Sequence, residues 1–529
     1  MVKTKVPVKV PGRSSFDKSY KNILTTKVGT ITPLVCKFII PGSNVHLKIA
    51  LSASLPPLAS DCFMRCALKT EAFFVPMRLL YGGTESWLTG SLLHDYNANT
   101  DVRAELPRIY FTSSHWNTEK TYLGPCSLAD YLGARVDVAN SMGSGASDSY
   151  LNIFPFLAYH RVYHDWYRNA KVQTPVFGQP IELDLHTSGV YPAALPFVAR
   201  GSIMNFELSD TLMDGERLGN LRQRNYGDDY FTIGSPSAQM GSAQSVSTSG
   251  NTFTIAALRA ANSLQQFAER SNLGSPRLQD YVRSHYGCDL RSGIAQRSVL
   301  LGSASFDVYS KGIEGTTTST ATNNPFTSVG ARYGNAFASG SDFVCDFEAN
   351  EPGYLFVNAT LVPEANYSTG IDKHLRSFTQ AGSQVDIPDP LLENVGNEPV
   401  YASELNGELA ASLGSVCSYV PRYTRHKTGL NEVHGLLISG QSLASFVAQR
   451  YFAPSSPVAI GSGMLKIPTT ALDNVTAVSS ALSTYGVWID SFIDFKVAEP
   501  LSECAIPSLQ DPAYEHGKSV YVKINGSHI

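Results

Sequence analysis

Four segments of the chain carry the hydrophobic patterns of β-strands. Between residues 45 and 51 apolar side chains alternate with polar ones, as in a strand with one buried face. The same period of two recurs at 487–497, and a further strand is predicted at 65–75. Residues 354–362 are almost continuously apolar, which predicts a central strand covered on both faces. Strands near both ends of the chain indicate a single sheet system that is complete only when the C-terminal strand has joined it.

Helical patterns are confined to the middle of the chain. Aromatic side chains recur every three or four residues at 156–169 and therefore line one face of a helix. Two more helices are predicted at 255–271 and 276–286. Two segments rich in Ser, Thr, Gly and Ala, 234–250 and 315–341, predict exposed loops.

These elements predict an all-β core, an eight-stranded jelly-roll β-sandwich with long loop and helical insertions. Eight strands of ordinary length need only on the order of 50–70 residues, so most of the chain must be insertion. We expect a basic N-terminal arm at 1–28 and a single jelly-roll domain at 29–529. Its insertions are expected at about 76–340 and 363–480.

The composition of the 529-residue chain suits a protein that packs against copies of itself. Only 16% of the residues are charged, against about 25% in typical soluble proteins. Fewer charges are typical of surfaces that become buried between subunits. A loop-rich β-protein that works as a monomer explains the same composition and stays open as an alternative.

The first 27 residues carry a strong excess of positive charge on a chain whose net charge is −4. Asp17 is the acidic residue of this segment, and its basic residues are Lys3, Lys5, Lys9, Arg13, Lys18, Lys21 and Lys27. A lysine-rich segment neutralises phosphates without reading bases, so Lys3, Lys5, Lys9 and Arg13 are our candidate nucleic-acid contacts. The alternative is a terminus that only improves solubility.

Metal and redox chemistry find little support in the sequence. His160 and His164 lie four residues apart on a predicted helix, but Arg161 stands where a zinc protease needs glutamate. The eight cysteines are scattered and form no paired zinc motif. No secretory segment and no apolar run of membrane-spanning length are evident, which favours reduced thiols in a cytoplasm. We expect no metal and no cofactor.

Catalysis is not expected either. Asp228-Asp229 and the Asp386–Asp389 region offer carboxylates for a glycosidase, but no nucleophile elbow or phosphate-binding loop accompanies them. We therefore predict a protein without catalytic residues. A carbohydrate-active or lectin-like β-sandwich remains the main alternative, and a soluble nucleic-acid binder is the second.

Several motifs, in one order along the chain, resemble the major capsid protein of the Microviridae. The longest is PFLAYHRVYHDWYRNAKVQTPVF at 155–177. The others are Ser15-Phe16-Asp17, FFVPMRLL at 73–80, Asp229-Tyr230-Phe231-Thr232, the helical segment at 258–287, Glu351-Pro352-Gly353-Tyr354 and Pro421-Arg422-Tyr423. The gokushovirus-like branch of these small single-stranded DNA phages is the most similar group.

The resemblance implies a structural protein of the virion with a viral jelly roll. Sixty copies, gathered as pentamers, would form a T=1 icosahedral shell around a circular single-stranded DNA genome in the bacterial cytoplasm. The implied partners are an internal scaffolding protein, a DNA pilot protein, a small basic DNA-binding protein and a host surface receptor. Tyr163, Trp166, Tyr167 and Arg168 would serve packing or assembly.

One departure from the gokushovirus pattern concerns the surface of the shell. In that group a long insertion between the Asp-Tyr-Phe-Thr motif and the paired helices builds a threefold protrusion. Only residues 233–253 occupy this place here, which is too short for a large protrusion. The 315–341 loop is our candidate substitute.

Overall fold

The computed structural model of the protein describes most of residues 13–501. The residues outside the described part are 1–12, 61, 64, 82–83, 91, 96–99, 104–105, 112–115, 135–148, 177–204, 240–253, 274–276, 290–295, 315–331, 376–387, 389, 391–392, 394–395, 409–414, 454–457, 479–480 and 502–529.

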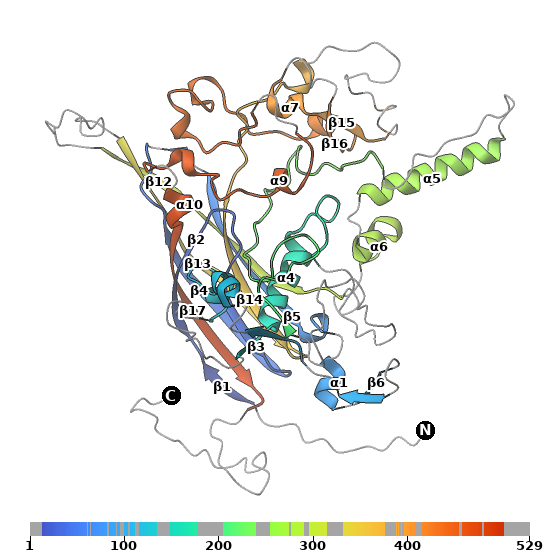
Figure 1. Ribbon diagram of the computed structural model, residues 1–529. Helices are drawn as coiled ribbons and strands as arrows, with labels where there is room; N and C mark the ends of the chain where they lie inside the picture. The colour runs from blue at the N-terminus through green and yellow to red at the C-terminus, as the bar shows by residue number, and fades with distance from the viewer. Residues whose placement is uncertain are drawn as a thin grey trace, which may run out of the picture.

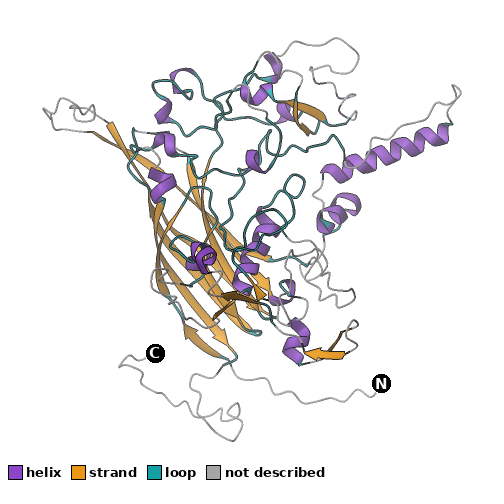
Figure 2. Ribbon diagram, in the orientation of Figure 1, coloured by secondary structure: helices purple, strands orange, loops and turns teal. Residues whose placement is uncertain are grey.

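Two antiparallel sheets pack face to face and form a β-sandwich (Figure 1; Figure 2). In hydrogen-bonding order the larger sheet contains β1 (Ser14–Asp17), β17 (Val487–Glu499), β4 (Ser43–Ser54), β13 (Arg332–Ala349) and β12 (Tyr309–Glu314), and β2 (Tyr20–Thr26) also pairs with β17. The smaller sheet contains β11 (Val299–Asp307), β5 (Cys66–Pro76), β14 (Gly353–Pro363) and β3 (Thr32–Ile39).

The connections between the strands are those of a jelly roll. Along the chain β2, β3, β4 and β5 alternate between the two sheets, and β13, β14 and β17 alternate again. The predicted all-β core is confirmed, although the described sheets contain ten strands where we expected eight. The difference arises because β1 and β2 share one edge position beside β17, and because β12 extends the opposite edge.

The interior of the sandwich follows the predicted alternation. In β4 the apolar side chains at 45, 47, 49 and 51 are buried, and their neighbours are exposed except the half-buried Ala50. β17 shows the same alternation between its inward and outward side chains. Every residue of β14 is buried, because β5 and β3 flank it and both of its faces are covered.

Two long insertions pack beside the sandwich (Figure 1). The first follows β5 and contains α1 (Thr84–Thr89), β6 (Leu92–Asp95), β7 (Thr100–Arg103), β8 (Arg108–Phe111), α2 (Trp116–Glu119), α3 (Leu128–Tyr131), β9 (Ser149–Asn152), α4 (Phe154–Val162), β10 (Asn205–Phe206), α5 (Ile255–Leu273) and α6 (Leu278–Tyr286). The second follows β14 and contains β15 (Glu398–Tyr401), α7 (Ser403–Asn406), β16 (Val416–Val420), α8 (Thr424–Lys427), α9 (Ser462–Leu465) and α10 (Ala481–Tyr485).

Three expected boundaries differ from the structure. Strands β1 and β2 place residues 14–26 in the larger sheet, so that part of the expected 1–28 arm belongs to the sandwich. Strands β11 and β12 also belong to the sheets, so the first insertion ends near residue 298 rather than 340. Residues 332–341 form strand β13 rather than a loop, because small side chains there fit against the facing sheet.

The segment 234–239 is not a fully exposed loop either. The Ser235 backbone exchanges hydrogen bonds of 2.8 Å with that of Tyr419 in β16. Residues 240–250 of the same predicted loop, and 315–331 of the other, lie outside the described residues.

Candidate assembly and nucleic-acid interfaces

The aromatic helix predicted at 156–169 packs inside its own subunit. α4 is continued by a π-helical turn, Tyr163–Tyr167, and Pro155 occupies its first turn, where no backbone donor is needed. Its buried side chains form a second hydrophobic core with Phe73 and Phe356 on the outer face of the smaller sheet. This face of the helix is therefore covered by the chain itself.

Tyr163, Trp166 and Tyr167 each contribute to this second core, and they are held differently. Tyr163 and Tyr167 are buried, with 2% and 7% of their surface exposed. The half-buried Trp166 donates its indole N–H to the carbonyl of Ser298 at 3.0 Å, and the Arg297 guanidinium stacks 3.7 Å from its ring centroid. These contacts join the helix to the segment that leads into β11.

A partly buried carboxylate fixes Tyr167 against the sheet. The Tyr167 hydroxyl donates to Glu71 in β5 at 2.5 Å, and Arg224 donates two hydrogen bonds to the same carboxylate at 2.7 and 2.8 Å. Burial raises the pKa of Tyr167 well above its ordinary value, and the charge of Glu71 adds to that shift. Tyr167 therefore stays a neutral donor at physiological pH.

Arg168 ends the π-helical turn and is turned toward its own chain. It donates to the carbonyl of Gln173 at 2.8 Å, while its buried Nε has no hydrogen-bond partner among the described residues. Burial, together with the nearby Arg277, lowers its pKa to about 10.

The two histidines at 160 and 164 are held by hydrogen bonds within the subunit. Arg222 donates from Nε to Nδ1 of His160 at 2.9 Å, so the proton of that ring is on Nε2, which donates to the carbonyl of Leu218 at 2.8 Å. Burial lowers the pKa of His160, and it lowers that of His164 to about 3. Within the described part of the chain, no group of three or more His, Cys, Asp or Glu is placed to hold a metal ion.

The Asp-Tyr-Phe-Thr motif joins the two insertions. Asp229 accepts the hydroxyl of Tyr367 at 2.6 Å and the backbone N–H groups of Phe231 and Thr232 at 2.9 Å. Tyr230 donates to Glu404 in α7 at 3.0 Å. Sequence reasoning recorded this motif but missed its role, because both partners lie more than a hundred residues away.

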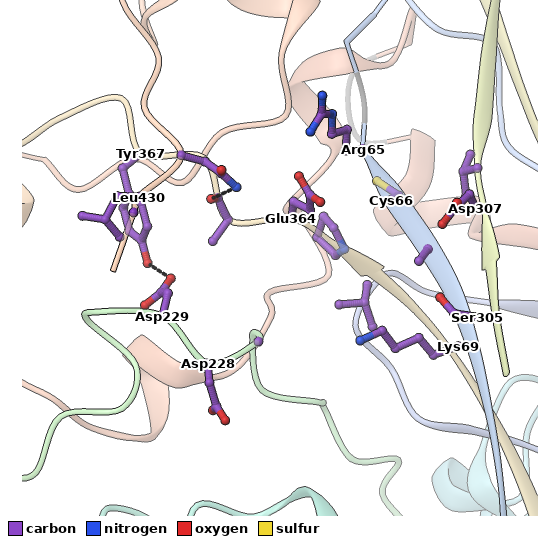
Figure 3. A pocket seen from close by; sticks show the side chains of 18 residues that line it. Arg65, Cys66, Lys69, Asp228, Asp229, Ser305, Asp307, Glu364, Tyr367 and Leu430 are labelled. Atoms are coloured by element: carbon purple, nitrogen blue, oxygen red, sulfur yellow. Dashed lines mark hydrogen bonds between the residues drawn. The ribbon is translucent and has the colours of Figure 1, made fainter. Parts of the chain in front are cut away.

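A cleft of about 700 Å³ opens beside this motif, between the N-terminal end of β5 and the second insertion (Figure 3). Arg65, Lys69 and Glu364 lie on one wall, and Asp228 lies on the other with the bonded pair of Asp229 and Tyr367. Asp229 is thus committed to holding the turn, which leaves it poorly suited to the glycosidase role considered above. Asp386 and Asp389 lie outside the described residues.

The candidate nucleic-acid residues fall into two groups. Arg13 donates to Glu348 of β13 at 3.0 Å and so pairs with the sandwich. Lys18 and Lys21 likewise pair with acidic residues of β17, at 2.8 and 2.9 Å. Lys3, Lys5 and Lys9 lie outside the described residues.

Large apolar side chains are exposed on several surfaces of the described subunit, two of which are considered first. On the outer face of the larger sheet, Trp488, Phe337 and Tyr309 stand in one cross-strand row with Ser54, and their exposed fractions are 49%, 45% and 60%. The other surface is α5, which projects away from the sandwich (Figure 1). Such surfaces are typical of sites that another molecule covers.

Comparison with protein families identifies the class of the chain. The family model described as "Capsid protein (F protein)" matches residues 4–509. The chain belongs to this capsid-protein family.

Two relatives place this capsid protein among the Microviridae, which confirms the resemblance found from the motifs. The capsid protein VP1 of Chlamydia phage 1 is 22% identical, over 96% of this chain and 97% of its own length. The capsid protein VP1 of Bdellovibrio phage phiMH2K is 22% identical, over 83% of this chain and 85% of its own. The chain is a component of the phage virion, and none of its described helices is long and apolar enough to cross a membrane. The carbohydrate-active alternative finds no support in these relatives.

Proposed function

We propose that this capsid protein assembles with copies of itself, through pentamers, into a T=1 shell of sixty subunits around a circular single-stranded DNA genome. The observation that carries the assembly step is the open stripe of α5. Ala257, Ala260, Leu264 and Phe267 recur at helical spacing on one face, and all four are exposed.

The described part of the chain holds the other face of α5, where Gln265 bonds to Gln239 and Asn272 to Ser235, but it leaves most of the apolar stripe uncovered. Most of the stability of a helix in a protein comes from packing of its apolar face rather than from helix propensity. The contact of α5 with α6 is limited to one end, where the Phe267 ring lies 4.8 Å from that of His285. A neighbouring subunit would cover the remaining apolar surface.

Replacing Leu264 by Asp is expected to prevent shell formation while the subunit still folds. Leu264 is 52% exposed, so the change costs the isolated subunit little, but a carboxylate would be buried against the neighbour. Each 1.4 kcal/mol lost at such a contact weakens the association constant tenfold, and a closed shell repeats the contact many times. Particle yield by sedimentation and negative-stain imaging provides the measurement.

The matched control is Gln266→Asp, which adds the same charge to the polar face of the same helix. We expect normal shells from this variant. Shells from Leu264→Asp in normal yield would show that α5 is not a subunit contact.

We further propose that Lys3, Lys5 and Lys9 contact the phosphates of the packaged DNA, with Arg13 anchoring the segment to Glu348 at 3.0 Å. The ion pairs of Lys18 and Lys21 reduce the positive charge available further along the chain. An internal scaffolding protein, a DNA pilot protein, a small basic DNA-binding protein and a host receptor complete the proposed set of partners. Assembly would take place in the bacterial cytoplasm.

Exchanging Lys3, Lys5 and Lys9 together for Glu is expected to lower the amount of nuclease-protected DNA per particle without stopping shell formation. Exposed cation–phosphate contacts weaken with salt, so the difference from wild type should shrink as the salt concentration rises. The same three positions changed to Arg keep the charge and should package normally. Normal packaging by the Glu variant at low salt would assign genome contact to other residues.

For Tyr163, Trp166, Tyr167 and Arg168 we propose a supporting role in assembly. They hold the first insertion on the smaller sheet and so keep the surfaces of the subunit in place. The bonds of Tyr167 to Glu71 at 2.5 Å and of Trp166 to Ser298 at 3.0 Å support this role.

A further inference from the structure

An aromatic groove lies beside the edge strand of the smaller sheet. It has a volume of about 600 Å³, and its walls include Phe38 of β3, Tyr354 of β14, Trp87 of α1 and Tyr150 of β9. The exposed fractions of Phe38, Trp87 and Tyr150 are 47%, 43% and 46%. Aromatic side chains left open around a groove of this size are typical of a site that binds a chain segment.

The first twelve residues leave the described part of the chain close to this groove. Arg13 reaches to within 3.8 Å of the position that a Cβ atom would take at Gly42. Gly42 is in the turn that follows β3, the strand that carries Phe38. Twelve extended residues span at most about 40 Å. This reach exceeds the length of the few residues that separate the turn from Phe38 in β3.

The chemistry of this segment matches the groove on one face only. Val6, Val8 and Val10 alternate with Lys5 and Lys9, and in an extended chain successive side chains point to opposite faces. The prolines at 7 and 11 favour extended backbone for themselves and for the residues before them. Proline-containing extended segments bind aromatic-lined grooves in several protein families.

We propose that residues 1–12 bind in the aromatic groove of their own chain, with Val6, Val8 and Val10 against the rings of Phe38, Trp87 and Tyr150. The lysines then face outward. Charge supports this orientation. Arg108 lines the groove, with its guanidinium 3.7 Å from the centroid of the Tyr150 ring, and it would repel a lysine side chain placed inside the groove. The inference concerns where the segment is held and does not depend on genome binding by its lysines.

Trypsin cleavage after Lys9 in the full-length chain tests the proposal. Cleavage follows the fraction of time that the segment is released, so wild type should be cut slowly. Val8→Asp, Trp87→Ala and Tyr150→Ser should each raise the rate at least about tenfold, the effect of losing one well-buried contact. Trp87 and Tyr150 are half exposed, so the fold tolerates their replacement.

The control is Trp488→Ala, which removes an equally exposed tryptophan from the outer face of the larger sheet and should leave the rate unchanged. Wild-type cleavage rates in Val8→Asp and in both groove variants would overturn the proposal. A rise in Trp488→Ala equal to that in Trp87→Ala would also overturn it, because the effect would then not belong to the groove.

A cross-link identifies which copy supplies the segment. The double variant Val8→Cys with Leu106→Cys, which places a thiol in the groove and leaves Phe38, Trp87 and Tyr150 intact, is treated with a short thiol-bridging reagent in an equal mixture of isotope-labelled and unlabelled chains. We expect bridged peptides that are fully labelled or fully unlabelled, since both thiols belong to one chain. Mixed-label bridges, or bridging no more frequent than with Val8→Cys and Trp488→Cys, would overturn the own-chain assignment.

Discussion

Replacing Arg222 by Met is expected to lower the free energy of unfolding of the subunit by about 3–5 kcal/mol. Arg222 is 1% exposed and donates to Asp214 at 2.6 Å and to Nδ1 of His160 at 2.9 Å. Methionine fills a similar space but leaves the carboxylate and the ring nitrogen without their donor. A buried charge that loses its partner is far more costly than the pair is favourable.

The effect can be measured by urea unfolding of unassembled subunits. The control is Arg217→Met, which removes an exposed arginine from the same segment and should change the unfolding free energy by less than about 1 kcal/mol. If Arg222→Met cost no more than this control, the buried network would contribute little to stability.

Trp166→Ala is expected to destabilise the subunit by about 3 kcal/mol, the lower end of the range for such changes because the ring is only half buried. The loss combines the contact with Phe73, whose ring centroid is 5.9 Å away, the stacked Arg297, and the hydrogen bond to Ser298. Fewer shells should form because fewer subunits fold. Unfolding midpoints and soluble subunit yield provide the measurement.

Trp166→Phe separates packing from hydrogen bonding at this position. It keeps an aromatic ring beside Phe73 and Arg297 and loses only the indole donor, for an expected cost of about 1 kcal/mol. An alanine variant with wild-type subunit stability but no shells would place Trp166 between subunits, contrary to the contacts described above.

Much of the sandwich is predictable from local pattern. The strand at 45–51 and the strand at 487–497 both alternate strictly, because each buries one face in the same core. The apolar run at 354–362 correctly indicates a central strand. Helices α5 and α6 begin and end within a few residues of their predicted positions.

What local pattern could not show is pairing across long stretches of chain. Strand β2 alternates only weakly, and residues 14–26 include the charged Asp17, Lys18 and Lys21, so this segment resembles an arm until β17 is placed beside it. In β13 the small residues that suggest a loop are required by packing, since a Cβ atom at Gly340 would overlap the ring of Phe306. Neither partner is visible from the strand's own sequence.

The candidate sites show the same division. An aromatic face at 156–169 is evident in the sequence, but whether the chain or a neighbour covers it depends on β5 and β14, which come from opposite sides of the first insertion. The role of Asp229 depends on Tyr367, which enters from the second insertion. Charge alone also overstated the basic arm, because Arg13 pairs with Glu348.

The place of β17 in the larger sheet has a consequence for biosynthesis. This strand lies between β2 and β4, yet a hydrogen bond from Ser491 to Asn22 spans 469 positions of the chain. At the usual rate of translation, β2 waits roughly 20–90 s on the ribosome for its partner to be made. Until then the edges of β2 and β4 that pair with β17 stay unpaired and open to other chains, and a prematurely terminated product can never complete its sheet. Translation as far as β17 therefore acts as a checkpoint, so that a polypeptide truncated before it lacks the finished surface on which a neighbour could dock.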